Sequence, residues 1–217
     1  MRFSHALALC LLVGVSSIAA ADTIPYTVTI PVTKVADGLV VYLQKFDPSL
    51  GTLTGIELQL DASASAGTIT WDNESGTPTS VDLGIGAEVT AVAPNALTLI
   101  AIPLQTGSGS VLPDSDGAPD FTGDDAFTVT GGSGSDSDTD YPGTVDFSYY
   151  TGLDTFAVSI SSALETSMDT HGGSGASYSE AGTYSGMVTV IYTYVPEPAT
   201  LTLLGSGAVL LYRRKRR

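Results

Sequence analysis

The chain has 217 residues, with 23 acidic and 8 basic side chains, and a net charge of −15 at neutral pH. Between Asp22 and Val195 the basic residues are Lys34 and Lys45 alone, against 22 acidic ones, which makes this region's net charge −20. A surface this acidic repels nucleic acid and anionic lipid, so nucleic acid is excluded as a partner. Plain solubility explains the charge, and attraction of cations is the alternative.

The N-terminus has the three parts of a secretory signal peptide. Arg2 supplies a positive start, Ala6 to Val15 is apolar, and Ala19 and Ala21 place small side chains before a cleavage point. We therefore expect residues 1–21 to direct export through the Sec translocation machinery and to be removed. Cys10, the only cysteine, lies inside this segment. The mature chain is then without disulfides, thiolate catalysis or zinc–thiolate sites.

The region 22–194 reads as one β-rich domain. Apolar and polar residues alternate from Tyr26 to Val32 and from Ile56 to Asp61, the period of half-buried strands. Further strands are expected at 39–46, 68–71, 80–83, 87–92, 97–102, 126–130, 145–150, 155–160 and 187–194. The fold class predicted is all-β, an antiparallel β-sandwich or jelly roll. The segments 105–125, 131–143 and 170–182 are rich in Gly, Ser and Asp and are predicted to be loops, and 162–168 is the one mildly helical stretch.

An acidic cluster is the candidate metal site. Carboxylates alternate with glycine and small residues at Asp114, Asp116, Asp120, Asp124 and Asp125. Oxygen ligands on a turning backbone suit calcium, which makes calcium the candidate cofactor. The spacing departs from an EF-hand loop, because no glutamate closes it and no helices flank it. A solvated acidic loop is the alternative.

Catalytic patterns are weak, and the chain is predicted not to be an enzyme. His171 is the only histidine after the signal peptide, and no Gly-x-Ser-x-Gly element accompanies it. A secreted hydrolase would need two carboxylates, or His171 with a nucleophile, in one pocket. A carbohydrate-binding module is the other alternative, since Trp71 and the ten tyrosines are able to stack on sugars.

The C-terminal tail, residues 195–217, has three parts in a fixed order. Val195 leads into Pro196, Glu197 and Pro198, where proline disfavours helix and keeps the chain extended. An uncharged run from Ala199 to Tyr212 is expected to form a membrane helix, although it is shorter than the roughly 20 residues of a full span. Five cations then stop transfer on the cytoplasmic side: Arg213, Arg214, Lys215, Arg216 and Arg217.

This order of a Val-Pro-Glu-Pro-Ala segment, a short apolar helix and a basic end resembles the PEP-CTERM sorting tail of exported bacterial proteins. The resemblance implies a processing partner, an exosortase-type membrane enzyme that cuts near Pro196–Pro198. It also implies a precursor anchored in the inner membrane and a final place in the cell envelope, at the outer surface or in the extracellular matrix. A structural or adhesive role in an exopolysaccharide or biofilm setting is the expected function, with exopolysaccharide as a candidate partner.

A second resemblance concerns the body of the chain. Three stretches are similar to the choice-of-anchor E domain: 46–53 leading into 55–60, 120–125 leading into 127–131, and 188–194. Within the first, Asp47, Pro48 and Gly51 are typical of a tight turn before a strand. The resemblance implies a β-rich secreted module over 22–194 and no particular chemistry.

Overall fold

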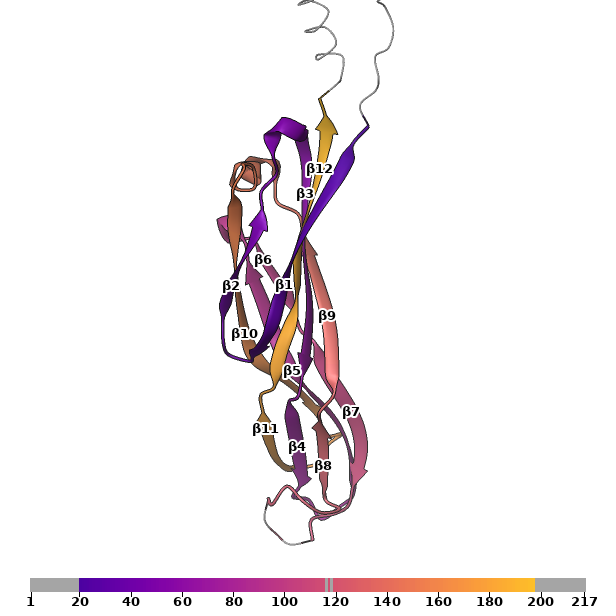
Figure 1. Cartoon of the computed structure of the whole chain (residues 1–217). Coiled ribbons are helices and arrows are strands. Elements are labelled where there is room, and N and C mark those ends of the chain that lie inside the picture. The colour runs from indigo at the N-terminus through magenta and orange to yellow at the C-terminus, as the bar shows by residue number, and fades with distance from the viewer. Residues whose placement is uncertain (1–19, 116, 118, 198–217) are drawn as a thin grey trace, which may run out of the picture.

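A computed structural model describes residues 20–115, 117 and 119–197, and these residues are almost entirely antiparallel β-structure (Figure 1). The body is elongated, and both of its ends leave it at the same pole. The elements, in chain order, are β1 (Asp22–Lys34), β2 (Leu39–Gln44), η1 (Pro48–Leu50), β3 (Gly51–Ser65), β4 (Thr68–Asn73), β5 (Thr79–Val92), η2 (Pro94–Ala96), β6 (Thr98–Ala101), β7 (Leu104–Val111), β8 (Ala126–Thr130), β9 (Ser133–Asp140), η3 (Thr144–Tyr149), β10 (Thr155–Asp169), β11 (Gly175–Glu180) and β12 (Thr183–Pro196).

The upper half is a two-layer sandwich. One sheet has the strand order β1-β12-β3-β9, and the other has the order β2-β10-β5-β6. Successive side chains of a strand point to opposite faces of its sheet, and this decides which residues lie between the two sheets. Leu58 and Leu60 of β3 are buried there, whereas Gln59 faces outward. The same rule applies to Val188 and Val190 of β12. The predicted antiparallel all-β class is therefore confirmed.

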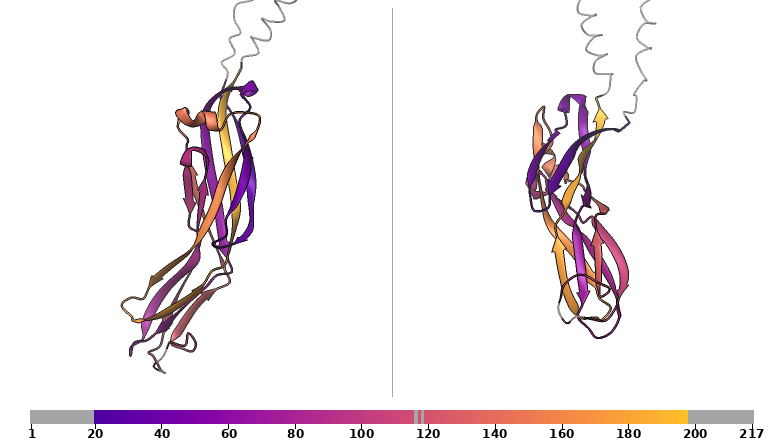
Figure 2. Two further views of the ribbon diagram at one scale, coloured as in Figure 1. Left: turned by 90° about the vertical axis from the view of Figure 1, so that its left-hand side faces the viewer. Right: turned by 60° about the horizontal axis from the view of Figure 1, so that its bottom comes forward.

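The lower half has a smaller core of its own. Here the three-stranded sheet β11-β4-β8 lies over the lower ends of β5 and β7 (Figure 2). The buried residues of this core are Ile69, Trp71, Val81, Leu83, Ile85, Val111 and Val129, with Phe127 packed against them. They come from β4, β5, β7 and β8. Strands β10 and β11 flank this core and contribute none of its residues.

A waist separates the two halves. One layer breaks at the same level three times, between β3 and β4, β8 and β9, and β11 and β12, whereas β5 and β10 run through both halves. Glycines let backbone segments approach one another closely at the waist. A Cβ on Gly182 would lie 2.0 Å from the Ser65 carbonyl oxygen, and a Cβ on Gly86 would lie 1.9 Å from the Pro103 carbonyl oxygen. The cavity left at the waist, about 10 Å³, has room for about one water molecule.

Buried tyrosines tie the upper layers together through their hydroxyl groups. Tyr192 of β12 donates to the Gln44 carbonyl of β2 (3.0 Å), and Tyr184 donates to the Asp37 carbonyl (2.9 Å). Tyr150 donates to the Pro94 carbonyl, and burial raises its pKa to about 12. Each ring fills apolar space while its one polar atom is satisfied, which explains why tyrosine is frequent in these strands.

Several sequence predictions were wrong, and packing explains them. The glycine-rich stretches expected to be loops contain β7, β9 and β11. In β7, Gly107 and Gly109 lie against β8, where an added Cβ would come within 2.8 Å of Val129 and 2.4 Å of the Phe127 ring. These glycines thus make room for large neighbours and do not mark flexible chain.

Two other stretches also differ from expectation. Residues 162–168, expected to be mildly helical, belong to β10, because they pair continuously with β5 from Leu83 to Val89. Residues 145–150, expected to be a strand, fall in the 3₁₀ helix η3 and its cap, after Pro142 and Gly143. In the first case sheet pairing overrides weak local preference, and in the second the turn residues prevail.

Candidate functional site

The sorting segment begins inside the folded domain. Strand β12 runs to Pro196, so that Val195 pairs with Thr52 and Pro196 pairs with Gly51 of β3. The domain therefore extends two residues beyond the expected boundary at 194. Glu197 follows and is exposed. Pro198, the apolar run and the five terminal cations lie outside the described residues.

Gly51 is what lets β3 start against the end of β12. Its φ is +148°, and a Cβ there would lie 2.2 Å from the Val195 carbonyl oxygen and 2.8 Å from Pro196 Cα. Just before it, the backbone N–H of Ser49 donates to the Asp47 carboxylate (2.8 Å), which caps the short helix η1. The predicted Asp47–Pro48–Gly51 turn is confirmed. It lies against Val195 and Pro196, where the chain leaves the domain, and we call this place the outlet of the tail.

The N-terminal end of the domain lies beside this outlet. Strand β1 begins at Asp22, directly after the predicted cleavage point at Ala21, and Asp22 pairs with Tyr194 of β12. The Tyr194 hydroxyl also lies 3.3 Å from the Asp22 carboxylate. Residues 1–19 of the predicted signal peptide, Ala19 among them, lie outside the described residues, whereas Ala20 and Ala21 are described and exposed. Within the described part, no helix has the length and apolar character needed to cross a membrane.

The acidic cluster lies at the opposite, distal pole, where its carboxylates hold the loop itself. Asp120 accepts from the Thr122 N–H and hydroxyl, and Asp114 accepts from the Gly117 N–H. Asp125 is 6% exposed and accepts from the Ser115 N–H and hydroxyl. Among the described residues, no three His, Cys, Asp or Glu side chains are grouped to hold a metal. Asp116 is outside the described residues, and Asp124 bonds the loop through its carbonyl.

Two buried polar residues that the sequence analysis missed organise this pole. Asp72, 3% exposed at the end of β4, accepts from the N–H groups of Asp120 and Phe121 (2.9 and 2.7 Å). The neighbouring Asn73 amide donates to the carbonyls of Thr77 and Leu112. The available signal was the pair of polar residues that closes the alternating stretch from Thr68 to Trp71, since such residues are rarely buried without a structural task.

Calcium binding by the acidic cluster stays a prediction. If the cluster binds calcium, we expect millimolar calcium to raise the melting temperature of the wild-type chain, because an ion that binds only the folded state stabilises that state by mass action. The variant Asp116→Asn plus Asp120→Asn should lose that rise. Equal shifts of the two proteins, or no shift in either, would remove the hypothesis.

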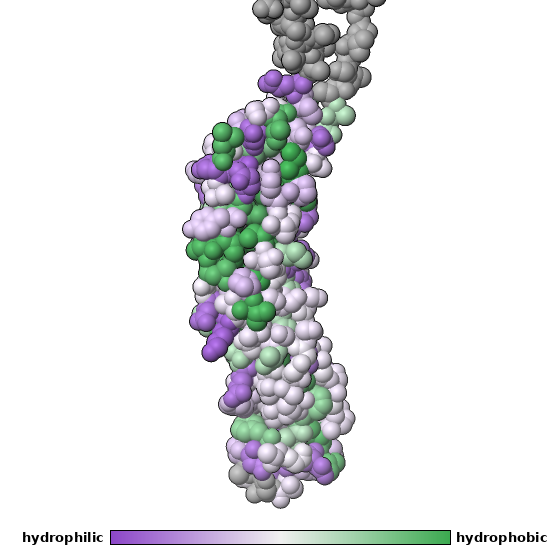
Figure 3. Space-filling view, in the orientation of Figure 1, coloured by the Kyte–Doolittle hydropathy of each residue, from purple (hydrophilic) through white to green (hydrophobic). Residues whose placement is uncertain are grey.

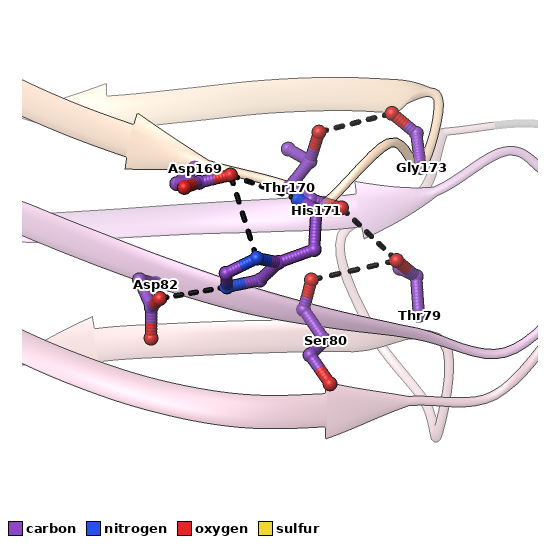
Figure 4. A network of polar contacts seen from close by, with 7 residues as sticks. All are labelled: Thr79, Ser80, Asp82, Asp169, Thr170, His171 and Gly173. Atoms are coloured by element: carbon purple, nitrogen blue, oxygen red, sulfur yellow. Dashed lines mark hydrogen bonds and ion pairs between the residues drawn. The ribbon is translucent and has the colours of Figure 1, made fainter.

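His171 also lies at the distal pole, between two carboxylates (Figure 4). Its Nε2 is 2.8 Å from Asp82 Oδ2 on β5, and its Nδ1 is 3.8 Å from Asp169 Oδ1 at the end of β10. A histidine that serves as a general base needs one ring nitrogen directed at a nucleophile. Here both ring nitrogens face carboxylates, an arrangement that pins the turn after β10 to β5.

This arrangement predicts a pH dependence of stability. The hydrogen bond to Asp82, and then the charge of Asp169, raise the pKa of His171 above its usual value of 6.5. A raised pKa in the folded state means that the stabilisation is fully present below pH 6.5 and is lost as pH rises through the raised value. We expect thermal stability to fall across this window, and His171→Gln should abolish the dependence. NMR titration of the ring checks the direction, and a pKa at or below 6.5 would contradict it.

The aromatic residues do not form one sugar-binding row in the described part of the chain. Trp71, a candidate for stacking on sugars, is 1% exposed in the lower core. The exposed tyrosines Tyr42, Tyr141, Tyr149 and Tyr178 lie on four different segments. Tyr178 contacts Phe121 of the distal loop, with ring centroids 6.1 Å apart.

The last strand of the β-domain, β12, ends at Pro196 and leads directly into the C-terminal tail. That tail matches the PEP-CTERM protein-sorting motif over residues 195–217. The motif implies an exported protein with a membrane-anchored precursor, processed by an exosortase-type membrane enzyme. The match covers the tail only, and the resemblance of the body to the choice-of-anchor E domain finds no support.

Other comparisons add no function. No curated protein matches the chain. Solved structures of infectious bursal disease virus are similar at low level: the Gx strain at 12% identity and a TM-score of 0.22, covering 91% of this chain and 48% of the viral chain. The Gt strain has 14% identity and a TM-score of 0.18, covering 88% and 48%. This chain thus spans about half the length of the viral chains, and such TM-scores do not establish a shared fold.

Proposed function

We propose that the protein is a non-catalytic surface protein, released from its tail into the cell envelope or the extracellular matrix, where it has a structural or adhesive role beside exopolysaccharide. The observation that carries the proposal is the outlet of the tail. The sorting segment leaves the domain at Pro196, next to the start of β1, while the distal pole lies at the far end (Figure 1). A membrane-held precursor of this shape presents its distal pole and both broad faces outward.

A polar face supports contact with hydrated polysaccharide. The outer face of the sheet β1-β12-β3-β9 carries a row of Thr27, Thr189, Gln59 and Thr139 across its four strands. The hydroxyls of Thr27 and Thr189 lie 2.9 Å apart. Beside this row is an open groove of about 380 Å³ lined by Asp61, Ser63, Ser135, Ser137 and Met187, among others. Hydroxyl and amide groups of this kind exchange hydrogen bonds readily with sugars and water.

The surface of the molecule suits this setting. Figure 3 shows polar and weakly hydrophobic residues over most of the lower half, with a larger apolar area on the upper left. Such a surface, with a strongly negative net charge, favours a protein that stays dispersed in water after release. The hydrolase alternative is less well supported, because His171 has carboxylates at both ring nitrogens.

The experiment is substitution of Glu197 by alanine in the full chain. Glu197 follows the last paired residue of β12 and is exposed, so export and folding should be unchanged. We expect the variant to accumulate uncut in the inner membrane, whereas the wild type reaches the outer fractions. Fractionation with an antibody to the domain measures this, with Glu57→Ala as a control on the exposed face of β3. Normal release of the Glu197 variant would contradict the proposal.

A further inference from the structure

The lower half of β10 is an edge strand without a neighbour on one side. Residues 159–169 pair with β5, but pairing with β2 ends at Ile160. The turn before β2 covers the next position, because the Ala36 N–H donates to the Ser162 hydroxyl (3.1 Å). Residues 163–169, which we call the open edge, have no strand partner away from β5 in the described part of the chain.

The two edge strands of the β1-β12-β3-β9 sheet carry features that prevent strand addition. Strand β1 has Pro25, Pro31 and a register shift between Ile30 and Thr33. Strand β9 carries Asp136 and Asp138, whose carboxylates accept from the N–H groups of Ile102 and Ile100 and so seal that edge to β6. Prolines, bulges and inward-directed charges are the usual protection of exposed edges.

The open edge has none of these features. It contains no proline or lysine, and its register with β5 is continuous. Its two faces differ in chemistry. Leu164 and Met168 lie on the inner face but are 38% and 51% exposed, because the lower core does not extend to β10. On the outer face, Glu165 lies near Glu88 of β5, which pairs with Ala163.

These two faces define the segment that fits. A strand added beside residues 163–169 would place alternate side chains next to Leu164 and Met168, and the others next to Glu165, with Glu88 one strand further away on β5. We propose that the open edge binds an extended polypeptide segment in which apolar residues alternate with lysine or arginine. Backbone hydrogen bonds would supply affinity, and the alternating side chains would supply specificity.

A second copy of this chain is a poor occupant of the edge. Between residues 22 and 195 it offers two lysines, of which Lys45 is already paired with Asp154 at 3.1 Å. Two bodies of charge −20 also repel each other over the distance set by ionic screening. The charge of the edge therefore favours a different, basic partner.

A labelled ten-residue peptide of alternating lysine and valine is the probe, added to the full chain in neutral detergent. We expect saturable binding by fluorescence anisotropy, with hydrogen-exchange protection appearing at amides within 163–169. A peptide of alternating glutamate and valine should not bind. Met168→Lys places a cation on the inner face and should weaken binding about tenfold, as should Glu165→Gln. Met187→Lys, at a methionine of similar exposure on the opposite sheet, is the matched control.

Three results would overturn the proposal. The first is equal binding of the lysine and glutamate peptides, and the second is protection outside the open edge. The third is self-association of the chain without peptide, with protection of the same amides, which would make a second copy the occupant. Because Glu165→Gln removes one half-buried charge without adding bulk, it keeps the test valid even if Met168→Lys fails to fold.

Discussion

Replacing Trp71 by alanine should lower the free energy of unfolding by about 3–5 kcal/mol, the usual cost of removing a large aromatic side chain from a core. Trp71 is the largest residue of the lower core and is 1% exposed. That core has seven buried members, so the surrounding side chains have little means of filling the space. The loss should therefore be near the upper end of the range.

Urea denaturation followed by circular dichroism measures the Trp71 effect. Tyr178→Ala, on the exposed face of the neighbouring strand β11, is the control and should cost less than about 1 kcal/mol. Trp71 is also the only tryptophan, so its fluorescence in the wild type reports on the lower half. A loss below about 1 kcal/mol for Trp71→Ala would contradict the packing described for the lower core.

Gly51→Val should disturb the outlet of the tail and lower the free energy of unfolding by about 2–3 kcal/mol. Valine does not adopt a φ of +148° without strain, and its Cβ would overlap the Val195 carbonyl. The end of β12 should separate from β3 as a result. The amide hydrogen of Val195 should then exchange fast with solvent, and an added protease should cut the chain within the last residues of β12.

Gly76→Val is the matched control for Gly51→Val. No atom lies within 4 Å of a Cβ placed on Gly76, so the same substitution there should change stability by less than about 0.5 kcal/mol. Similar effects at both positions would show that Gly51 is not needed for the close approach of β3 and β12.

The class of fold could be predicted from the sequence because alternation is a local signal. Tyr26, Val28 and Ile30 on β1, and Leu58 and Leu60 on β3, show a period of two whatever they pack against. The Asp47–Pro48–Gly51 turn could be predicted for a similar reason, since its residues restrict their own backbone.

Features set by contacts distant in sequence could not be predicted. In the sequence, Gly107 and Gly109 indicate a loop. Only the structure shows that Phe127, on another strand, occupies the space that their side chains would need. The strand character of 162–168 depends on pairing with β5, and the task of Asp72 depends on the N–H groups of a loop 48 residues away. No local pattern carries this information.

The candidate site divides in the same way. The order of prolines, apolar residues and cations can be read directly from the sequence of residues 195–217, so the sorting motif could be recognised without a structure. That β12 carries its pairing up to Pro196, opposite Gly51, could not be. Because the folded domain leaves no free linker before Pro196, we expect any processing cut to fall after the end of β12.

Mass spectrometry of the protein recovered from outside the inner membrane tests the central claim most directly. If the tail is a processing signal, the released protein begins near Asp22 and its C-terminus lies in the Pro196–Pro198 region, with the apolar run and the five terminal cations removed. Recovery of an intact C-terminal peptide ending at Arg217 from the extracellular fraction would contradict the account.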